Sequence, residues 1–225
     1  MSSDKFHRRP LFRLALFLFC ALLIFLSFYI LYAFTNTLNQ LDLVELDRDH
    51  WQRPLDVLRA LDLREGNTVV DLGSGAGYFA LKLSPAVGKR GQVLAIDLRR
   101  LSLFFLWTRA LLRGQHNIRV MVGEEDNPRL PDGTVDAVLI CNTYHEFSNR
   151  ERMLEHTFRS LRTGRRLVLV DRAPGVTEAE QSHEIPLPVA ETELRKMGFQ
   201  IVRREYPFLD QPGDGSWWLL IAQKP

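Results

Sequence analysis

The sequence predicts an α/β fold, a mostly parallel sheet covered by helices on both faces, preceded by one long apolar helix. Strand-like apolar runs alternate with helical stretches along most of the 225 residues, which is typical of doubly wound sheets. The last two strand-like runs are separated only by PFLDQPGDG. That segment is too short for a crossover helix, so these strands should form an antiparallel hairpin.

The apolar helix is predicted at residues 11–34, LFRLALFLFCALLIFLSFYILYAF, where Arg13 is the one charge. At about 1.5 Å per residue this run is roughly 36 Å long, enough to cross a hydrocarbon core of about 30 Å. It is longer than the apolar region of a cleaved secretory signal and lacks a clear small-residue cleavage site. We therefore expect a basic tail at 1–10, a transmembrane signal anchor at 11–34, a juxtamembrane linker at 35–50 and a globular domain at 51–225.

Charge predicts the orientation of this anchor. Lys5, Arg8, Arg9 and Arg13 precede or open the span, whereas no Lys or Arg follows it before Glu45. The positive-inside rule then places the N-terminus in the cytoplasm and the domain outside it.

Composition excludes several classes of partner. Residues 1–13 hold four of the 29 Lys and Arg residues and one of the 27 Asp and Glu residues, so the remainder is close to neutral and no nucleic-acid partner is expected. The two cysteines, Cys20 in the apolar run and Cys141 at a strand end, are not expected to form a disulfide. No Cys-x-x-Cys or His-x-x-x-His spacing occurs, so we expect no metal site.

The elements follow in a regular order. A short amphipathic helix is expected at 51–63, with Leu55, Leu58 and Leu61 on one face. Strands are expected at 67–72, 91–98, 117–123, 135–142, 165–173, 199–206 and 216–223. Helices are expected at 78–87, ended by Pro85, at 99–114 and 150–164, each closed by a glycine, and at 189–199.

Two aromatic groups need an interpretation. Phe104, Phe105 and Trp107 cannot all face one core, so the helix at 99–114 is either a buried crossover helix or a membrane-facing surface. Trp217 and Trp218 are neighbours on the last strand, so we expect one ring in the core and the other exposed.

The stretch VVDLGSGAGYF, residues 69–79, places Asp71 at a strand end and glycines at 73, 75 and 77 in the following turn. Glycines let a ligand approach the backbone closely, and the helix beginning near Tyr78 directs free N–H groups to the same place. The G-x-G-x-G spacing differs from the dinucleotide fingerprint G-x-G-x-x-G. Because a carboxylate repels a pyrophosphate and attracts a cation, the turn favours a positively charged, nucleoside-like ligand.

Asp97 ends the next strand, in VLAIDL, and should lie at the same sheet edge. A carboxylate there can accept hydrogen bonds from both hydroxyls of a ribose. Asp126, after the third strand, can accept one from an exocyclic amine.

These motifs together resemble those of the class I S-adenosylmethionine-dependent methyltransferases. VVDLGSGAGYF resembles the first motif of that family, AIDL the acidic motif after it, and DAVLICN the fourth-strand motif. The resemblance covers about residues 47–225 and implies strand order 3-2-1-4-5-7-6, with strand 7 antiparallel, for a methyltransferase-like domain. DRDHWQRPLDVL and YHEF further resemble a poorly characterised bacterial group of exported or membrane-anchored methyltransferases, which implies a single-pass protein of the bacterial inner membrane.

The resemblance implies S-adenosyl-L-methionine as cofactor and assigns residues to it. Those expected at its methionine part are Asp71, Gly73, Ser74, Gly75 and Gly77. Asp97, with Leu98 beside it, would hold the ribose, and Asp126 would lie near the adenine. One departure is LRTGRR before the fifth strand, where the family usually has L-K/R-P-G-G.

The segment NTYHEF, residues 142–147, begins where an acceptor would bind. His145 is our candidate general base, and Glu146 would orient it or serve instead. Asn142 would hold the cofactor's amino group or the substrate, and Tyr144 would cover the cofactor or line the pocket. Alternatively, the His-Glu pair only caps the following helix or lies on the surface. His183 and Glu184 are second choices for the site.

The leading hypothesis is a membrane-anchored methyltransferase acting on a small-molecule or lipid-like acceptor. One alternative is a module that binds S-adenosylmethionine or S-adenosylhomocysteine without turnover. Another is a nicotinamide-dependent oxidoreductase, although Ser148 stands where a Tyr-x-x-x-Lys pair beginning at Tyr144 would need lysine. The site of cofactor synthesis conflicts with the charge rule, because S-adenosylmethionine is made in the cytoplasm.

Overall fold

A computed structural model describes residues 4–174, 184–211 and 215–225. The chain forms two compact units, Met1–Glu45 and Leu46–Pro225, which we describe separately. The prediction for His183 lies outside the described residues.

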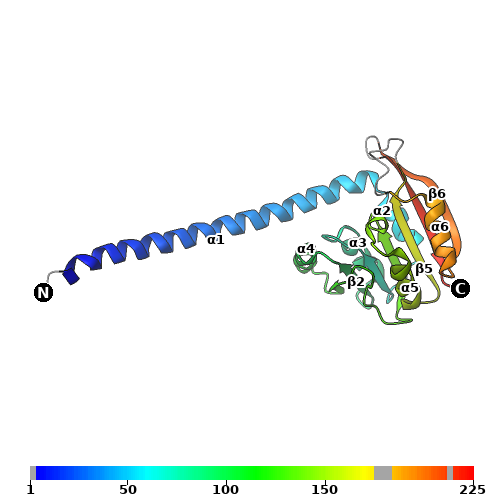
Figure 1. Ribbon diagram of the computed structural model, residues 1–225, viewed down its shortest axis with the longest axis horizontal. Coiled ribbons are helices and arrows are strands. Elements are labelled where there is room, and N and C mark those ends of the chain that lie inside the picture. Colours follow the sequence, from blue (N-terminus) through cyan, green and yellow to red (C-terminus); the bar gives the residue numbers. More distant parts are fainter. Residues whose placement is uncertain (1–3, 175–183, 212–214) are drawn as a thin grey trace. The chain divides into compact units, whose positions relative to one another are not determined.

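The described residues of the first unit are all part of α1 (Asp4–Trp51), an uninterrupted helix (Figure 1). Within the described side chains, Phe12–Trp51 is the one helix that is long and apolar enough to cross a membrane. Its large apolar side chains, from Phe12 to Tyr32, are exposed. Residues 35–50, which we assigned to a linker, continue the same helix.

The second unit contains a seven-stranded sheet, as predicted. Its strands are β1 (Thr68–Leu72), β2 (Gln92–Asp97), β3 (Ile118–Val122), β4 (Val135–Cys141), β5 (Leu161–Arg172), β6 (Gln200–Gln211) and β7 (Gly215–Gln223). They lie in the order β3-β2-β1-β4-β5-β7-β6. Strands β1 to β5 are parallel, and β7 is antiparallel to both neighbours, so the predicted order and the hairpin are confirmed.

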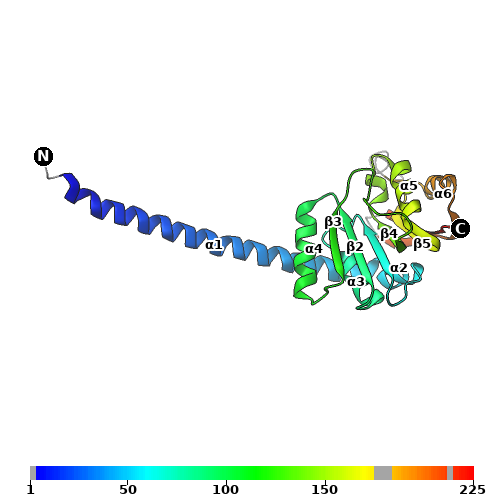
Figure 2. The same ribbon diagram turned by 90° about the horizontal axis from the view of Figure 1, so that it is seen from below.

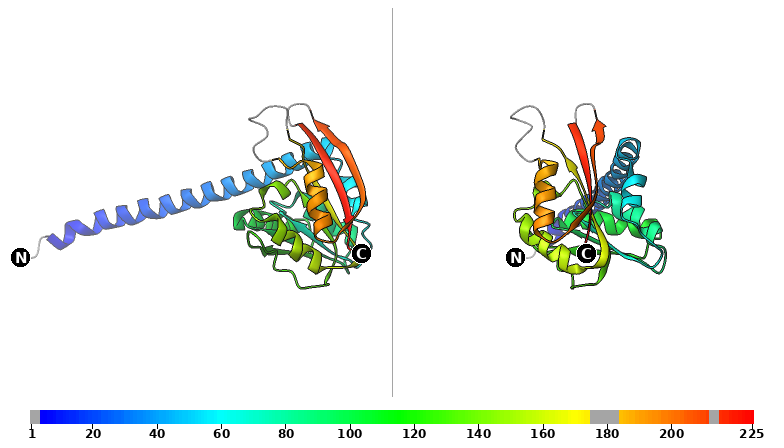
Figure 3. Two further views of the ribbon diagram at one scale, coloured as in Figure 1. Left: turned by 45° about the vertical axis from the view of Figure 1, so that its right-hand side comes forward. Right: turned by 90° about the vertical axis from the view of Figure 1, so that its right-hand side faces the viewer.

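Helices cover both faces of this sheet (Figure 3). One face packs against α2 (Pro54–Ala60), α3 (Tyr78–Val87) and α4 (Arg100–Leu112), and the other against α5 (Arg150–Ser160) and α6 (Leu187–Lys196). Successive residues of the buried strand β4 alternate between the two cores: Leu139 joins the first and Ile140 the second.

This two-sided burial corrects our prediction for the tryptophan pair. Trp217 and Trp218 are both fully buried, because each face of β7 meets a hydrophobic core. The Trp217 ring packs edge-on against Trp51, with ring centroids 5.8 Å apart. The indole N–H of Trp218 donates to the carbonyl oxygens of Arg172 and Ile185. The expectation that one ring is exposed is therefore wrong.

Some predicted boundaries also differ. The helix expected at 51–63 is interrupted, because Arg53 takes a left-handed conformation (φ 48°) before Pro54, which disfavours a helical residue in front of it. The helix predicted at 78–87 has the bounds of α3, although Pro85 lies inside this helix and does not end it. Helix α5 ends at Ser160, and β5 begins at Leu161 within the segment we assigned to the helix.

Candidate active site

The glycine turn after β1 has the backbone conformation that requires glycine. Gly73 and Gly77 adopt positive φ angles of 80° and 94°. A Cβ atom on Gly73 would lie 2.3 Å from the side chain of Thr143, and one on Gly77 would lie 2.2 Å from Leu106. Any side chain at these positions would force the turn away from β4 or α4.

Asp97 joins this turn to the end of β2. Its Oδ2 atom accepts a hydrogen bond from the backbone N–H of Gly75 (2.8 Å), and its Oδ1 atom accepts one from the backbone N–H of Arg99 (2.8 Å). The side chain is almost completely buried. Asp97 therefore holds the loops after two neighbouring strands at a fixed separation.

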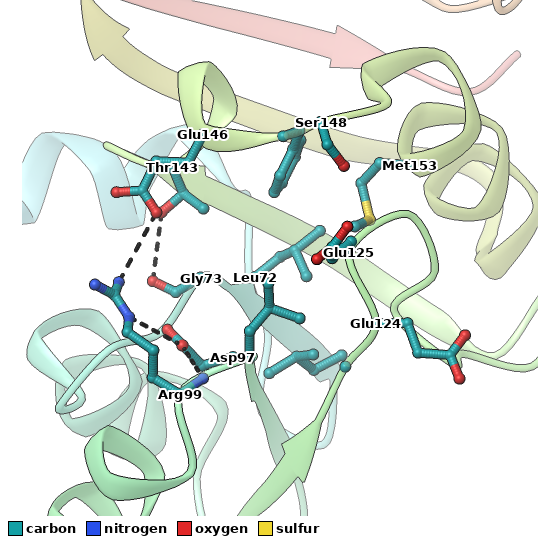
Figure 4. A pocket seen from close by; sticks show the side chains of 14 residues that line it. Leu72, Gly73, Asp97, Arg99, Glu124, Glu125, Thr143, Glu146, Ser148 and Met153 are labelled. Carbon is teal, nitrogen blue, oxygen red and sulfur yellow. Dashed lines mark hydrogen bonds and ion pairs between the residues drawn. The ribbon is translucent and has the colours of Figure 1, made fainter. Parts of the chain in front are cut away.

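A cavity of about 320 Å³ opens between these loops (Figure 4). Its walls come from the ends of β1 to β3 and from the segment after β4. The lining residues are Leu72, Gly73, Ile96, Asp97, Leu98, Arg99, Gly123, Glu124, Glu125, Thr143, Glu146, Phe147, Ser148 and Met153. Of the residues predicted to bind the cofactor, Gly73, Asp97 and Leu98 meet in this lining.

Two buried polar atoms beside the cavity have no hydrogen-bond partner: Asp71 Oδ2 and Ser74 Oγ. Burial raises the pKa of Asp71 to about 7, although a backbone hydrogen bond from Ala80 and the charge of Arg48 act in the opposite direction. A buried polar atom without a partner is costly unless a ligand satisfies it. The turn is thus prepared for a ligand that brings a donor or a positive charge.

Residues at the C-terminal end of α1 extend this environment, and we did not anticipate them. Gln52 is fully buried, and its Nε2 atom lies 3.3 Å from Cys141 Sγ. Arg48 donates to Gln52 Oε1 (2.6 Å), and its guanidinium lies 3.8 Å from the centroid of the Tyr78 ring. The sequence signal was an arginine in DRDHWQ, close to the predicted domain start.

Asn142 lies directly after β4 and has a left-handed backbone (φ 54°). Its N–H donates to Val170 O (2.8 Å), and its buried Oδ1 atom has no partner. It is not among the residues that line the cavity. A non-glycine residue in this conformation is often found at functional sites, so the assignment of Asn142 remains a reasonable prediction.

His145 is held by Asp171, at the end of β5. Its backbone N–H donates to Asp171 Oδ2 (3.1 Å), and its Nδ1 atom lies 2.8 Å from Asp171 Oδ1. A carboxylate only accepts hydrogen bonds, so Nδ1 carries the proton and Nε2 is the acceptor of the neutral ring. The hydrogen bond to the fully buried Asp171 raises the pKa of His145, despite the opposing effect of burial.

Asp171 is the residue that our sequence reasoning missed. Its signal was nevertheless present, because VLVDRA ends an apolar strand with an aspartate in the same way as VVDL and AIDL. Glu146, which we expected to orient His145 or to serve instead of it, lines the cavity and lies 3.9 Å from Arg99. Its charge also contributes to the raised pKa of His145, so its role remains a prediction.

The structure also places two further candidates, Asp126 and Tyr144. Asp126 forms an ion pair with Arg152 (3.1 Å), while Glu124 and Glu125 line the cavity, so its role near an adenine remains a prediction. Tyr144 is fully buried in the core, and its hydroxyl contacts Glu193. Among the described residues, no group of three or more His, Cys, Asp or Glu side chains could hold a metal ion.

Comparison with known proteins shows the family. The model of the ubiE/COQ5 methyltransferase family matches residues 24–184. The chain belongs to the ubiE/COQ5 methyltransferase family. It is thereby a class I, S-adenosylmethionine-dependent methyltransferase by family and by fold.

Individual relatives of this ubiE/COQ5 family member support the same assignment. The ubiquinone/menaquinone biosynthesis C-methyltransferase of Azotobacter vinelandii is 30% identical over 110 residues, 48% of this chain and 44% of the relative. This chain thus matches less than half the length of that relative. A methyltransferase structure from Aquifex aeolicus is 27% identical, with a TM-score of 0.68 over 77% of this chain and 90% of that chain.

A third comparison supports the fold alone. The phosphoethanolamine N-methyltransferase 2 of Haemonchus contortus, solved with S-adenosyl-L-methionine, is 15% identical, with a TM-score of 0.67 over 78% of this chain and 53% of that chain.

The residues of the ubiE/COQ5 site fit S-adenosyl-L-methionine. The partnerless Asp71 Oδ2 and Ser74 Oγ atoms suit the polar, cationic amino-acid end of the cofactor, and Asp97 in the cavity lining suits its ribose. We therefore assign the glycine turn and Asp97 as the residues that would hold it. The bound cofactor supplies an electrophilic methyl group on a sulfonium.

The ribose assignment predicts the effect of Asp97→Ala. The substitution should weaken S-adenosylmethionine binding by about 1.5–3 kcal/mol, the range for a hydrogen bond to a charged group. Calorimetric titration measures the loss. Asp132→Ala is the matched control, because Asp132 is an exposed aspartate paired with Arg159 away from the cavity lining. Unchanged affinity in Asp97→Ala would refute the ribose assignment.

The raised pKa of Asp71, about 7, predicts proton release when the cofactor binds. A cationic ligand favours the carboxylate, so affinity should increase as pH rises through about 7 and then level off. At pH 7 we expect about half a proton released per site, measured by calorimetry in buffers of different ionisation enthalpy. Asp71→Asn should abolish this proton release. The comparison distinguishes a proton released by Asp71 from one released by the ligand itself. Equal release by the wild type and Asp71→Asn would contradict the assignment.

Proposed function

We propose that this protein transfers the methyl group of S-adenosylmethionine to a small or lipid-like acceptor that carries a hydroxyl group. The observation that carries the proposal is the His145–Asp171 pair at the carboxyl ends of β4 and β5. Thr143, two residues before His145, contacts the Gly73 carbonyl (3.5 Å), so the segment of the pair adjoins the cofactor turn.

The pair suits a general base. The neutral His145 ring can accept a proton at Nε2, while Asp171 holds Nδ1 and stabilises the imidazolium that forms. Removing a proton from a phenolic hydroxyl raises the electron density on that oxygen and on the neighbouring ring carbons. The same base therefore serves O-methylation or methylation of an activated ring carbon.

The alternative nucleophile in this part of the chain is less suitable. Cys141 is buried, and burial raises the pKa of its thiol well above the ordinary value. Because the thiolate is the reactive form, Cys141 stays unreactive at neutral pH. The imidazole of His145 is the better candidate for proton transfer.

The acceptor class rests on two features. The Azotobacter relative is named a C-methyltransferase of ubiquinone/menaquinone biosynthesis, and quinols carry ring hydroxyls beside methylated carbons. The exposed apolar stretch of α1 is long enough to span a bilayer, where lipid-like quinols reside. We propose that residues 11–34 anchor the protein in a bacterial inner membrane.

The test is methyl transfer from tritium-labelled S-adenosylmethionine to a naphthoquinol that carries a short isoprenoid chain. His145→Gln should reduce the rate by about 10²–10⁴-fold, the usual contribution of a general base. In the wild type the rate should increase with pH through the raised pKa of His145. Asp171→Asn removes the largest cause of that shift, so the pH profile should move to lower pH.

Calorimetric titration with S-adenosylmethionine, S-adenosylhomocysteine and NAD is the control for these variants. His145→Gln should keep the wild-type affinity for both sulfur compounds, and NAD should give no signal. Cofactor binding without transfer to any hydroxylated acceptor would indicate a non-catalytic module. An unchanged pH profile in Asp171→Asn would contradict the proposed role of the pair.

The anchor and the activity together predict the orientation. Methyl transfer needs cytoplasmic cofactor, so a reporter that functions only in the cytoplasm should be active when fused after Pro225. Alkaline phosphatase fused at the same position should be inactive, because it folds only outside the cytoplasm. The opposite result would support the charge rule at Lys5–Arg13 and contradict the proposed activity in the cell.

A further inference from the structure

Helix α4 exposes a row of large apolar side chains that its role as a crossover helix does not require. Leu103, Leu106 and Ala110 pack into the core. On an adjoining side of the helix, Leu101, Phe104, Trp107 and Leu111 have exposed fractions of 68, 46, 49 and 51%. The rings of Phe104 and Trp107 stack with centroids 6.5 Å apart. Single exposed leucines are ordinary, whereas a continuous apolar row indicates an interaction surface.

A groove lies beside this row, between α4 and β3. It has a volume of about 340 Å³ and is lined by Arg100, Leu103, Phe104, Trp107, Val120 and Val122. β3 is the outermost strand on this side of the sheet, and α4 runs along it (Figure 2). We call the exposed row together with this groove the α4–β3 face.

Charge on this face has one sign. Neither α4 nor β3 contains an acidic residue, whereas Arg100 lines the groove. Arg119 is exposed on the edge strand β3, but its side chain points to the other face of the sheet from Val120 and Val122. Helices that lie in the headgroup region of anionic membranes typically combine tryptophan, phenylalanine and leucine with arginine. A cation at the rim of an apolar groove suits a lipid, whose anionic headgroup adjoins its acyl chain.

A second copy of the chain is a less suitable occupant. Pairing of two β3 edges would bring Arg119 of each copy into the interface, and charged residues on an edge strand oppose such pairing. The chain also contains the exposed apolar helix of α1, whose length suits a bilayer. A lipid surface is therefore the occupant that both features favour.

We propose that the α4–β3 face binds the surface of an anionic lipid bilayer, with Leu101, Phe104 and Trp107 at the boundary between headgroups and acyl chains. This contact is additional to the proposed anchor and does not depend on methyl transfer. It would also bring the cofactor cavity close to the lipid, because Arg99 lines the cavity and Arg100 lines the groove. A lipid-like acceptor would then have a short path to the site.

The experiment uses the full chain in nanodiscs of phosphatidylglycerol and phosphatidylcholine in equal amounts. Spin labels are placed at Leu101→Cys and, as matched control, at Leu55→Cys, each in a Cys20→Ser background. Leu55 is an equally exposed leucine (66%) on α2, away from the α4–β3 face. We expect the label at 101 to be more accessible to oxygen than to a nickel chelate and the label at 55 to show the reverse.

Native fluorescence tests the same contact without a label. Trp217 and Trp218 are buried and Trp51 is partly buried against Trp217, whereas Trp107 is half exposed, so brominated lipids should quench mainly Trp107. Trp107→Phe should remove this quenching, and replacing phosphatidylglycerol by phosphatidylcholine should weaken it. Aqueous accessibility at both labels, quenching that is unchanged in Trp107→Phe, or dipolar coupling between labels at 101 in two copies would each overturn the proposal.

Discussion

The candidate site depends on the hydrogen bonds that the buried carboxylate of Asp97 accepts from two backbone N–H groups. One belongs to Gly75 in the turn after β1, and the other to Arg99 in the loop after β2. Both loops would otherwise leave N–H groups to be satisfied by water or by a ligand. Because Asp97 satisfies them with a charged acceptor, the cavity walls are positioned before any ligand arrives. The remaining lone pairs of the same carboxylate are what a ribose would use.

Aspartates end three strands of the sheet, and their environments give them three different properties. Asp71 is buried without a partner at Oδ2, which makes its ionisation sensitive to a nearby cation. Asp97 is bound by backbone donors. Asp171 is fully buried and holds an imidazole. The same residue type thus suits cofactor charge, loop geometry and proton transfer, because burial and partners differ at each strand end.

Local sequence signals predicted the hairpin and the glycine turn because each depends on short-range features: loop length and residue type. The strand order was implied by the family resemblance. The tryptophan pair was misjudged because the exposure of β7 depends on residues far away in the chain, such as Trp51, whose ring packs against that of Trp217. The partner of His145 was missed for a related reason. Asp171 lies 26 residues from His145 and meets it only through the parallel pairing of β4 with β5. The strand-end aspartate in VLVDRA is visible in the sequence, but periodicity does not show which side chain it meets.

The geometry around Thr143 explains how the two halves of the site can cooperate. The cavity is lined by the ends of β1 to β3 and by the segment after β4, whereas the His145–Asp171 pair lies at the ends of β4 and β5 and is absent from the lining. Thr143 contacts Gly73 where these halves meet, and a Cβ atom on Gly73 would overlap its side chain. A larger residue at 73 would move the glycine turn away from the segment that carries His145, our proposed base, and methyl transfer over about 3 Å tolerates little separation. The glycine is therefore needed for the approach of β1 to β4 as much as for room beside a cofactor.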